Sequence, residues 1–188
     1  MPNSKAREVL HSLKVTENFT LGEIIGSRTA DRFGSDNSLP PYIWHQAQHC
    51  AKKMERVRIL LNDRPIIVTS WYRCTALNNA VDGKPSSRHL HGRAVDFVCP
   101  AYGSVDQVFT ALRHSNLVYD KLIDEFGRWV HIQFTMRDAC ARGHSFRFDP
   151  VTHRIIDFAQ TDFKSLKPVR IPAAHRPEDE EYIPGEDR

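Results

Sequence analysis

Hydrophobic residues along this chain follow a helical period in two stretches and strand-like spacing in several short ones. The longer helical stretch covers residues 41–61, where the apolar positions are Ile43, Ala47, Cys50, Ala51, Met54, Val57 and Leu61. This spacing places them all on one face of a helix, and Pro41 suits the first turn of that helix. A second amphipathic helix is predicted over residues 104–114. A short helix is predicted to start at Thr20, which has capping-box spacing to Glu23.

Short apolar runs between turn signals predict the strands. They cover residues 66–70, 93–99, 117–125 and 129–134, and a last small hairpin covers residues 146–156. The first run is expected to be a buried strand, and the turn at 126–128 is expected to join the third and fourth runs as an antiparallel pair. Residues 71–88 contain turn signals and predict a long loop. Together these elements predict an α+β domain, with helices packed on a small, mostly antiparallel sheet.

Composition divides the chain into three parts. Residues 18–159 have the apolar content of a folded domain, and residues 1–17 form a polar N-terminal arm. Residues 160–188 contain scattered prolines and the acidic run 178–181, so we expect an extended or disordered tail.

Charge and hydropathy exclude several classes of protein. The 26 Lys and Arg residues nearly balance the 23 Asp and Glu residues, giving a net charge of +3, and the basic residues are not clustered with aromatic ones. We therefore expect no nucleic-acid partner. No run is apolar enough for a membrane span or for a signal peptide, so we expect synthesis in the cytoplasm. The four cysteines lack C-x-x-C spacing and are expected to be reduced, although a pairing of Cys74 with Cys99 is conceivable.

The stretch from residue 86 to 97 holds the candidate metal site. Asp96 lies inside an apolar run, and a buried carboxylate is costly unless it is paired or bound to a metal. Strand alternation allows Asp96 and His131 to point into the same cleft. His89 lies in the loop just before the Asp96 strand, and His91 is an alternative ligand there. Two histidines and one aspartate form the ligand set of a catalytic zinc with a fourth position for water.

A hydrolase of this kind also needs a general base near the water. Glu125 is the best candidate because it lies across the tight turn from the strand that carries His131. Alternation should send its neighbour Asp124 to the opposite face of the sheet.

Several motifs in order resemble one family. Ser87-x-His89-x-x-Gly92-x-Ala94-x-Asp96, followed by Trp129-Val130-His131, resembles the zinc peptidases that cut peptidoglycan stem peptides. These include D-alanyl-D-alanine carboxypeptidases and phage L-alanyl-D-glutamate endolysins, and hedgehog signalling domains share the fold. Residues 18–23 look like the family's entry segment, and residues 69–73 look like its Ser-Gly-Tyr-Arg segment. The resemblance covers about residues 18–135.

The resemblance implies a role for each matching position. His89, Asp96 and His131 match the ligands of one zinc ion. Glu125 matches the catalytic acid/base, and Arg73 matches an arginine that binds a substrate carboxylate or the developing oxyanion. Substrate-binding or supporting roles are implied for Ser87, Trp129, Tyr72 and Gln133, with Ser87 supporting the ligand loop through a hydrogen bond.

The chain departs from the family pattern at several positions. Trp71 stands where glycine is usual, and we expect it to narrow the cleft or change the loop. Cys74 stands where serine is common, and Gln133 stands where a serine often follows the last ligand. Arg128 occupies the position at which some relatives carry the acid/base.

The implied function is zinc-dependent hydrolysis of a peptide bond in the peptidoglycan stem, by a D,D-carboxypeptidase or by an endopeptidase of the endolysin type. The expected partner is the stem peptide, and the expected place of action is the bacterial cell wall, reached by holin release or as part of a phage particle. The C-terminal tail is a candidate docking segment for a phage or lysis-system partner. The alternative is a catalytically inactive zinc-containing binding module, or a phage structural protein, with the same fold.

Overall fold

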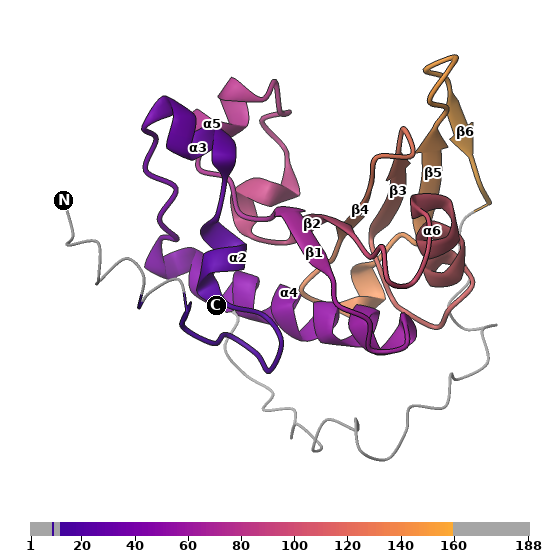
Figure 1. Cartoon of the computed structure of the whole chain (residues 1–188), viewed down its shortest axis with the longest axis horizontal. Coiled ribbons are helices and arrows are strands. Elements are labelled where there is room, and N and C mark those ends of the chain that lie inside the picture. Colours follow the sequence, from indigo (N-terminus) through magenta and orange to yellow (C-terminus); the bar gives the residue numbers. More distant parts are fainter. Residues whose placement is uncertain (1–8, 10–11, 160–188) are drawn as a thin grey trace.

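The computed structural model describes residue 9 and residues 12–159 of the chain (Figure 1). The predicted tail and most of the predicted arm lie outside the described residues. The helices are α2 (Leu21–Ile25), α3 (Arg28–Phe33), α4 (Pro41–Leu60), α5 (Thr75–Ala80) and α6 (Val105–Arg113), with 3-10 helices η1 (Arg88–His91) and η2 (Asp138–Cys140). The strands are β1 (Ile67–Ser70), β2 (Ala94–Val98), β3 (Lys121–Glu125), β4 (Trp129–Gln133), β5 (His144–Phe148) and β6 (Ile155–Asp157).

The six strands form one sheet in the order β1-β2-β4-β3-β5-β6. Strands β3 and β5 run parallel, and every other neighbouring pair is antiparallel. Figure 1 shows α4 running below the sheet, α6 beside the later strands, and α3 and α5 together on the opposite side of the molecule. The predicted α+β fold with a mostly antiparallel sheet is confirmed.

Local sequence signals explain where the main helices begin. The Thr20 side chain accepts from the backbone N–H of Glu23, and the Glu23 carboxylate accepts from the N–H of Thr20, which completes the predicted capping box of α2. Ser104 and Gln107 form a second capping box at α6. Helix α4 begins with Pro41 at its first position, where the missing N–H costs nothing.

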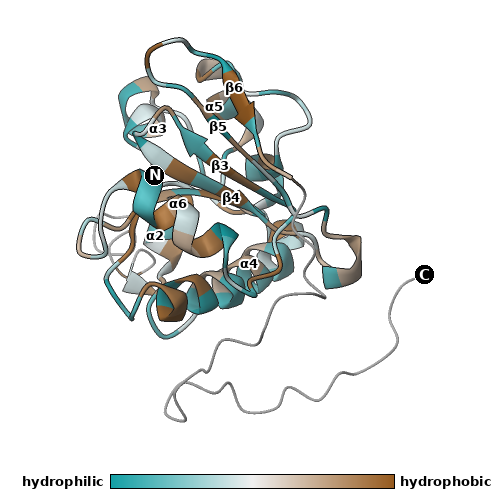
Figure 2. Ribbon diagram, turned by 90° about the vertical axis from the view of Figure 1, so that its right-hand side faces the viewer, coloured by the Kyte–Doolittle hydropathy of each residue, from teal (hydrophilic) through white to brown (hydrophobic). Residues whose placement is uncertain are grey.

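The core lies between α4, α6 and one face of the sheet. The predicted apolar face of α4 is buried, and hydrophilic and hydrophobic residues alternate along this helix and along the strands (Figure 2). The sheet residues that join this core are Val95, Phe97, Leu122, Val130 and Ile132. The opposite face of the same central strands carries Asp96 and His131, so the packed helices form a rigid support behind that face.

Three expectations about local structure are wrong. Strand β1 is an edge strand rather than a buried one, and its Ile67 side chain is 54% exposed. The region expected as a long loop contains α5, and α3 was not expected at all. Both helices have only six residues, too few for a helical period to repeat. The third strand starts at Lys121 instead of residue 117.

The described cysteines are all free, and no pairing of Cys74 with Cys99 forms. The Cys74 sulfur instead accepts from the backbone N–H of Leu77 at 3.4 Å and caps the start of α5. The Cys99 thiol lies 3.4 Å from the carbonyl oxygen of Pro65.

Candidate metal centre

Three elements bring the predicted metal ligands together. Asp96 lies in β2 and His131 in the neighbouring β4, and the two residues are directly opposite each other in the register. His89 comes from η1, which Gly92 caps just before β2 begins. His89 and Asp96 are buried, and the His131 side chain is 13% exposed. One edge of the site therefore faces solvent, and the rest is closed by protein.

The spacing of the ligand atoms fits a tetrahedral ion. Nε2 of His89 lies 3.4 Å from Nδ1 of His131 and 3.4 Å from Oδ2 of Asp96. Nδ1 of His131 lies 2.8 Å from Oδ1 of Asp96. Tetrahedral zinc with bonds of about 2.0–2.1 Å holds its ligand atoms about 3.4 Å apart. The donor set and the two distances from Nε2 of His89 therefore match a zinc ion. The 2.8 Å contact of His131 involves the other carboxylate oxygen of Asp96, and one ligand atom from each residue lies within 4.8 Å of the others.

The backbone of Trp71 selects the ring nitrogen that His89 offers to a metal. Nδ1 of His89 lies 2.6 Å from the carbonyl oxygen of Trp71. Because a carbonyl only accepts, Nδ1 carries the proton and Nε2 presents its lone pair to the site. Burial lowers the pKa of the His89 imidazole, which favours the neutral ring that a metal requires.

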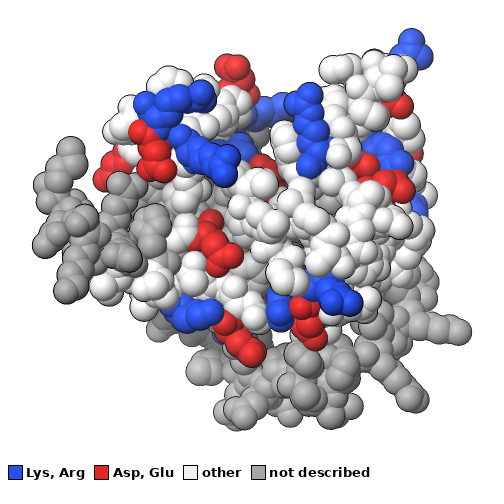
Figure 3. All heavy atoms as spheres, in the orientation of Figure 1, with Lys and Arg blue, Asp and Glu red and all other residues white. Residues whose placement is uncertain are grey.

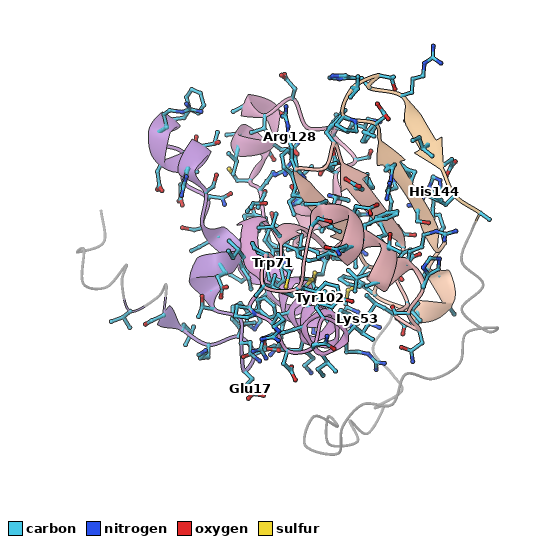
Figure 4. All side chains as sticks on the ribbon, turned by 45° about the vertical axis from the view of Figure 1, so that its right-hand side comes forward. Glu17, Lys53, Trp71, Tyr102, Arg128 and His144 are labelled. Atoms are coloured by element: carbon cyan, nitrogen blue, oxygen red, sulfur yellow. The ribbon has the colours of Figure 1, made fainter. Side chains whose placement is uncertain are left out.

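The Trp71 side chain also supports the ligand loop. It is fully buried, and Figure 4 shows it in the interior of the molecule. Its indole N–H donates to the carbonyl oxygen of Gly92 at 3.0 Å, and its ring packs edge-on against Phe19. Gly92 itself has a φ of 64°, and an added Cβ would lie 3.1 Å from the Ala47 side chain. The expectation that Trp71 narrows the cleft is wrong, because the side chain points into the core.

Arg73 contacts the metal ligands directly. Its Nη2 donates to Oδ2 of Asp96 at 2.6 Å, and its Nε donates to Oγ of Ser70 at 2.8 Å. Ser70 lies opposite Asp96 in the β1–β2 register, beside a bulge in β1. The backbone N–H of Arg73 also donates to the carbonyl of His89 at 3.1 Å. Arg73 thus orients two ligand residues, and three of its five N–H donors are left beyond these two side-chain bonds.

The charge of Asp96 is held by its neighbours. Burial opposes ionisation, but the charges and hydrogen bonds of His89 and His131 outweigh it and hold the pKa of the Asp96 carboxyl well below its usual range. The site therefore supplies a carboxylate with two imidazoles, the mixed oxygen and nitrogen set that suits zinc.

Glu125 lies on the same face of the sheet as the ligands. Ile123 is opposite His131 in the β3–β4 register, and Glu125 is opposite Trp129. Because side chains alternate along a strand, Glu125 and Trp129 lie on the same face of the sheet as His131. Burial raises the pKa of the Glu125 carboxyl, and the nearby Asp96 raises it further. A raised pKa suits a group that must take up and release a proton near neutral pH. Asp124 faces the other way as expected, accepting from the N–H of Gly127 at 2.8 Å.

The predicted supporting residues occupy different places. Ser87 caps η1, and its Oγ accepts from the backbone N–H of His89 at 3.3 Å. Trp129 is half-buried on the Glu125 side of the site, and its indole nitrogen is buried without a hydrogen-bond partner among the described residues. Tyr72 is buried, and its backbone bonds to Ile24 and Asn37. Gln133 donates to Asp120 at 2.5 Å, so its amide serves that carboxylate rather than the ligand atoms.

Asn37 is a supporting residue that the sequence did not indicate. Its side-chain nitrogen donates to the carbonyls of Ile25 and Tyr72, and its oxygen accepts from the N–H of Cys74 at 2.8 Å. These bonds clamp the segment that carries Arg73. The only signal was an asparagine in a polar loop, and burial of that side chain becomes visible only in the fold.

The family comparison covers every element of this site. The family model described as Peptidase M15 matches residues 17–133. The chain belongs to the peptidase M15 family. Its members are zinc-dependent peptidases, so the His89, Asp96 and His131 cluster lies within a metallopeptidase domain. No curated protein matches the chain. None of the helices in the described residues is long and apolar enough to cross a membrane.

Proposed function

We propose that this M15 peptidase hydrolyses a peptide bond in the stem peptide of bacterial peptidoglycan, using one zinc ion held by His89, Asp96 and His131. The observation that carries the proposal is the ligand cluster, in which one ligand atom from each residue lies within 4.8 Å of the others. The half-buried Glu125 lies on the same face of the sheet. Basic and acidic groups are interspersed on the face seen in Figure 3, which favours a peptide over a nucleic-acid partner.

Each residue of the site has a defined task in this hydrolysis. When bound, zinc supplies a Lewis acid that polarises the scissile carbonyl and makes a water more acidic. Glu125 takes the proton of the attacking water and passes it to the leaving amine. Arg73 holds Asp96 through one N–H and offers its remaining donors to a substrate carboxylate or to the oxygen that gains charge. Trp129 forms the wall next to Glu125.

The proposal includes both a D,D-carboxypeptidase and an endopeptidase of the endolysin type, because these ligands and this base serve either reaction. We place the activity at the cell wall, reached by holin release or on a phage particle, with residues 160–188 as the docking segment for a lysis or phage partner. Deletion of residues 160–188 should leave cleavage of small stem peptides unchanged and abolish that association.

The test is digestion of purified peptidoglycan with and without a zinc chelator, with products identified by mass. We expect new stem fragments only in the chelator-free arm, and their masses name the bond that is cut. Stoichiometric zinc binding without any cleavage would favour an inactive binding module and contradict the proposal.

A further inference from the structure

An open hollow of about 500 Å³ lies at the end of the sheet where β4 ends and β2 begins. Its charged lining consists of four arginines and one aspartate: Arg88, Arg93, Arg137, Arg142 and Asp120. The aspartate is already engaged, because it accepts two hydrogen bonds from the Arg142 side chain, one from the Arg142 backbone N–H and one from Gln133. Asp120 is therefore shared with Arg142, which leaves Arg88 and Arg93 as further cations at the same hollow.

Arg93 brings an unsatisfied donor to this cluster of cations. Its Nε is buried and has no hydrogen-bond partner among the described residues. Burial and the neighbouring Arg88 lower the pKa of the Arg93 guanidinium. Lys121 is in a similar electrostatic environment, since burial and the positive charge of Arg142 lower the pKa of its amine. A buried donor without a partner is costly. An anion bound in the hollow would offset the repulsion among these neighbouring cations.

The hollow adjoins the metal centre along the sheet. Gln133 lies two positions beyond His131 in β4 and is opposite both Ala94 and Lys121. Two strand positions correspond to about 7 Å, and the Gln133 amide contacts Asp120 on the wall of the hollow. Arg88 immediately precedes the ligand His89 in η1. An extended peptide held at the metal centre would therefore reach the hollow about two or three residues from the cleaved bond.

We propose that Arg88 and Arg93 form an anion subsite, with Lys121 beside it, that binds a carboxylate of the stem peptide away from the cleaved bond. A guanidinium group matches the planar, two-oxygen geometry of a carboxylate. This subsite rests on the proposed function for the identity of its ligand. It would make the enzyme distinguish stems whose γ-linked glutamyl residue carries a free carboxylate from stems in which that group is amidated.

The first test uses two synthetic stem peptides that differ only in this carboxylate or amide. We expect the wild type to have at least a tenfold higher kcat/KM for the peptide with the free carboxylate. The difference should come from a lower KM, with kcat unchanged. The Arg88→Gln and Arg93→Gln variants should each reduce this preference. In the double variant, the ratio of kcat/KM for the carboxylate peptide to kcat/KM for the amide peptide should be close to one. Arg154→Gln is the matched control, because Arg154 lies exposed directly before β6. This variant should retain the full preference.

A second measurement does not depend on turnover. The side-chain Nε–Hε signal of Arg93 is assigned in the ¹⁵N NMR spectrum by its loss in Arg93→Gln. In a zinc-loaded Glu125→Gln protein, adding the carboxylate peptide should shift this signal, and the amide peptide should shift it much less. An equal kcat/KM for both peptides, or a signal that responds only to inorganic phosphate, would overturn the subsite. Cleavage of neither peptide with a clear Arg93 shift would contradict the proposed function and retain the subsite.

Discussion

Replacement of Trp71 with phenylalanine tests the support of the ligand loop. The substitution keeps a buried aromatic ring next to Phe19 but removes the indole N–H that donates to Gly92 at 3.0 Å. A buried carbonyl left without its donor costs about 1–3 kcal/mol. The smaller ring leaves a small void that adds to this cost. We expect the free energy of unfolding to fall by about 2–3 kcal/mol. Zinc affinity should also fall, because Gly92 caps the η1 helix that carries His89.

Urea denaturation at a fixed free zinc concentration measures this loss, and a zinc titration measures the affinity. Trp129→Phe is the matched control: its indole nitrogen is also buried but has no partner within the described region, so no hydrogen bond is lost. The control should therefore be nearly neutral in stability. If both substitutions cost the same, or if Trp71→Phe costs nothing, the assigned role of the Trp71 N–H is refuted.

Three further substitutions test other parts of the site. Cys74→Ser should stabilise the fold by about 0.5–1 kcal/mol, since a hydroxyl is a better helix cap than a thiol at 3.4 Å; an unchanged urea midpoint would contradict this. Arg73→Lys should lower kcat/KM for a stem peptide at least tenfold, because lysine lacks the forked donors that hold Asp96; wild-type kinetics would exclude that role. Asp120→Asn should destabilise the fold most at neutral pH. Burial opposes ionisation of Asp120, but hydrogen bonds from Arg142 and Gln133 outweigh it and lower the pKa of this carboxyl below its usual 3.8. The ionised carboxylate therefore stabilises the folded state above pH 3.8, and this contribution is lost as the pH falls through the lowered pKa. A stability difference that is the same at pH 7 and pH 3 would contradict the assignment.

The arrangement of the candidate metal centre was predictable where it depends on periodicity. Strand alternation alone placed Asp96 and His131 on one face, and the register puts them directly opposite each other. The same alternation separated Glu125 from Asp124. These predictions succeeded because a strand has a fixed two-residue period, so the direction of a side chain follows from its position.

Features that depend on packing between distant segments were not predictable. At the Trp71 position the family usually has glycine, so the resemblance suggested a narrowed cleft or a changed loop. Only the fold shows that the indole packs against Phe19 and donates to Gly92. The Asn37 clamp joins residues 35 positions apart. The contact of Gln133 with Asp120 likewise depends on where the chain enters β3, which the apolar run from residue 117 did not reveal.

The most direct test of the account is zinc titration of metal-depleted protein, with hydrolysis of a stem peptide followed by mass. We predict that activity returns in proportion to zinc up to one equivalent. Glu125→Gln should bind the same single equivalent and remain inactive, because the ligands His89, Asp96 and His131 are intact and only the base is lost. Hydrolysis by the metal-depleted protein, or full activity in Glu125→Gln, would contradict the account.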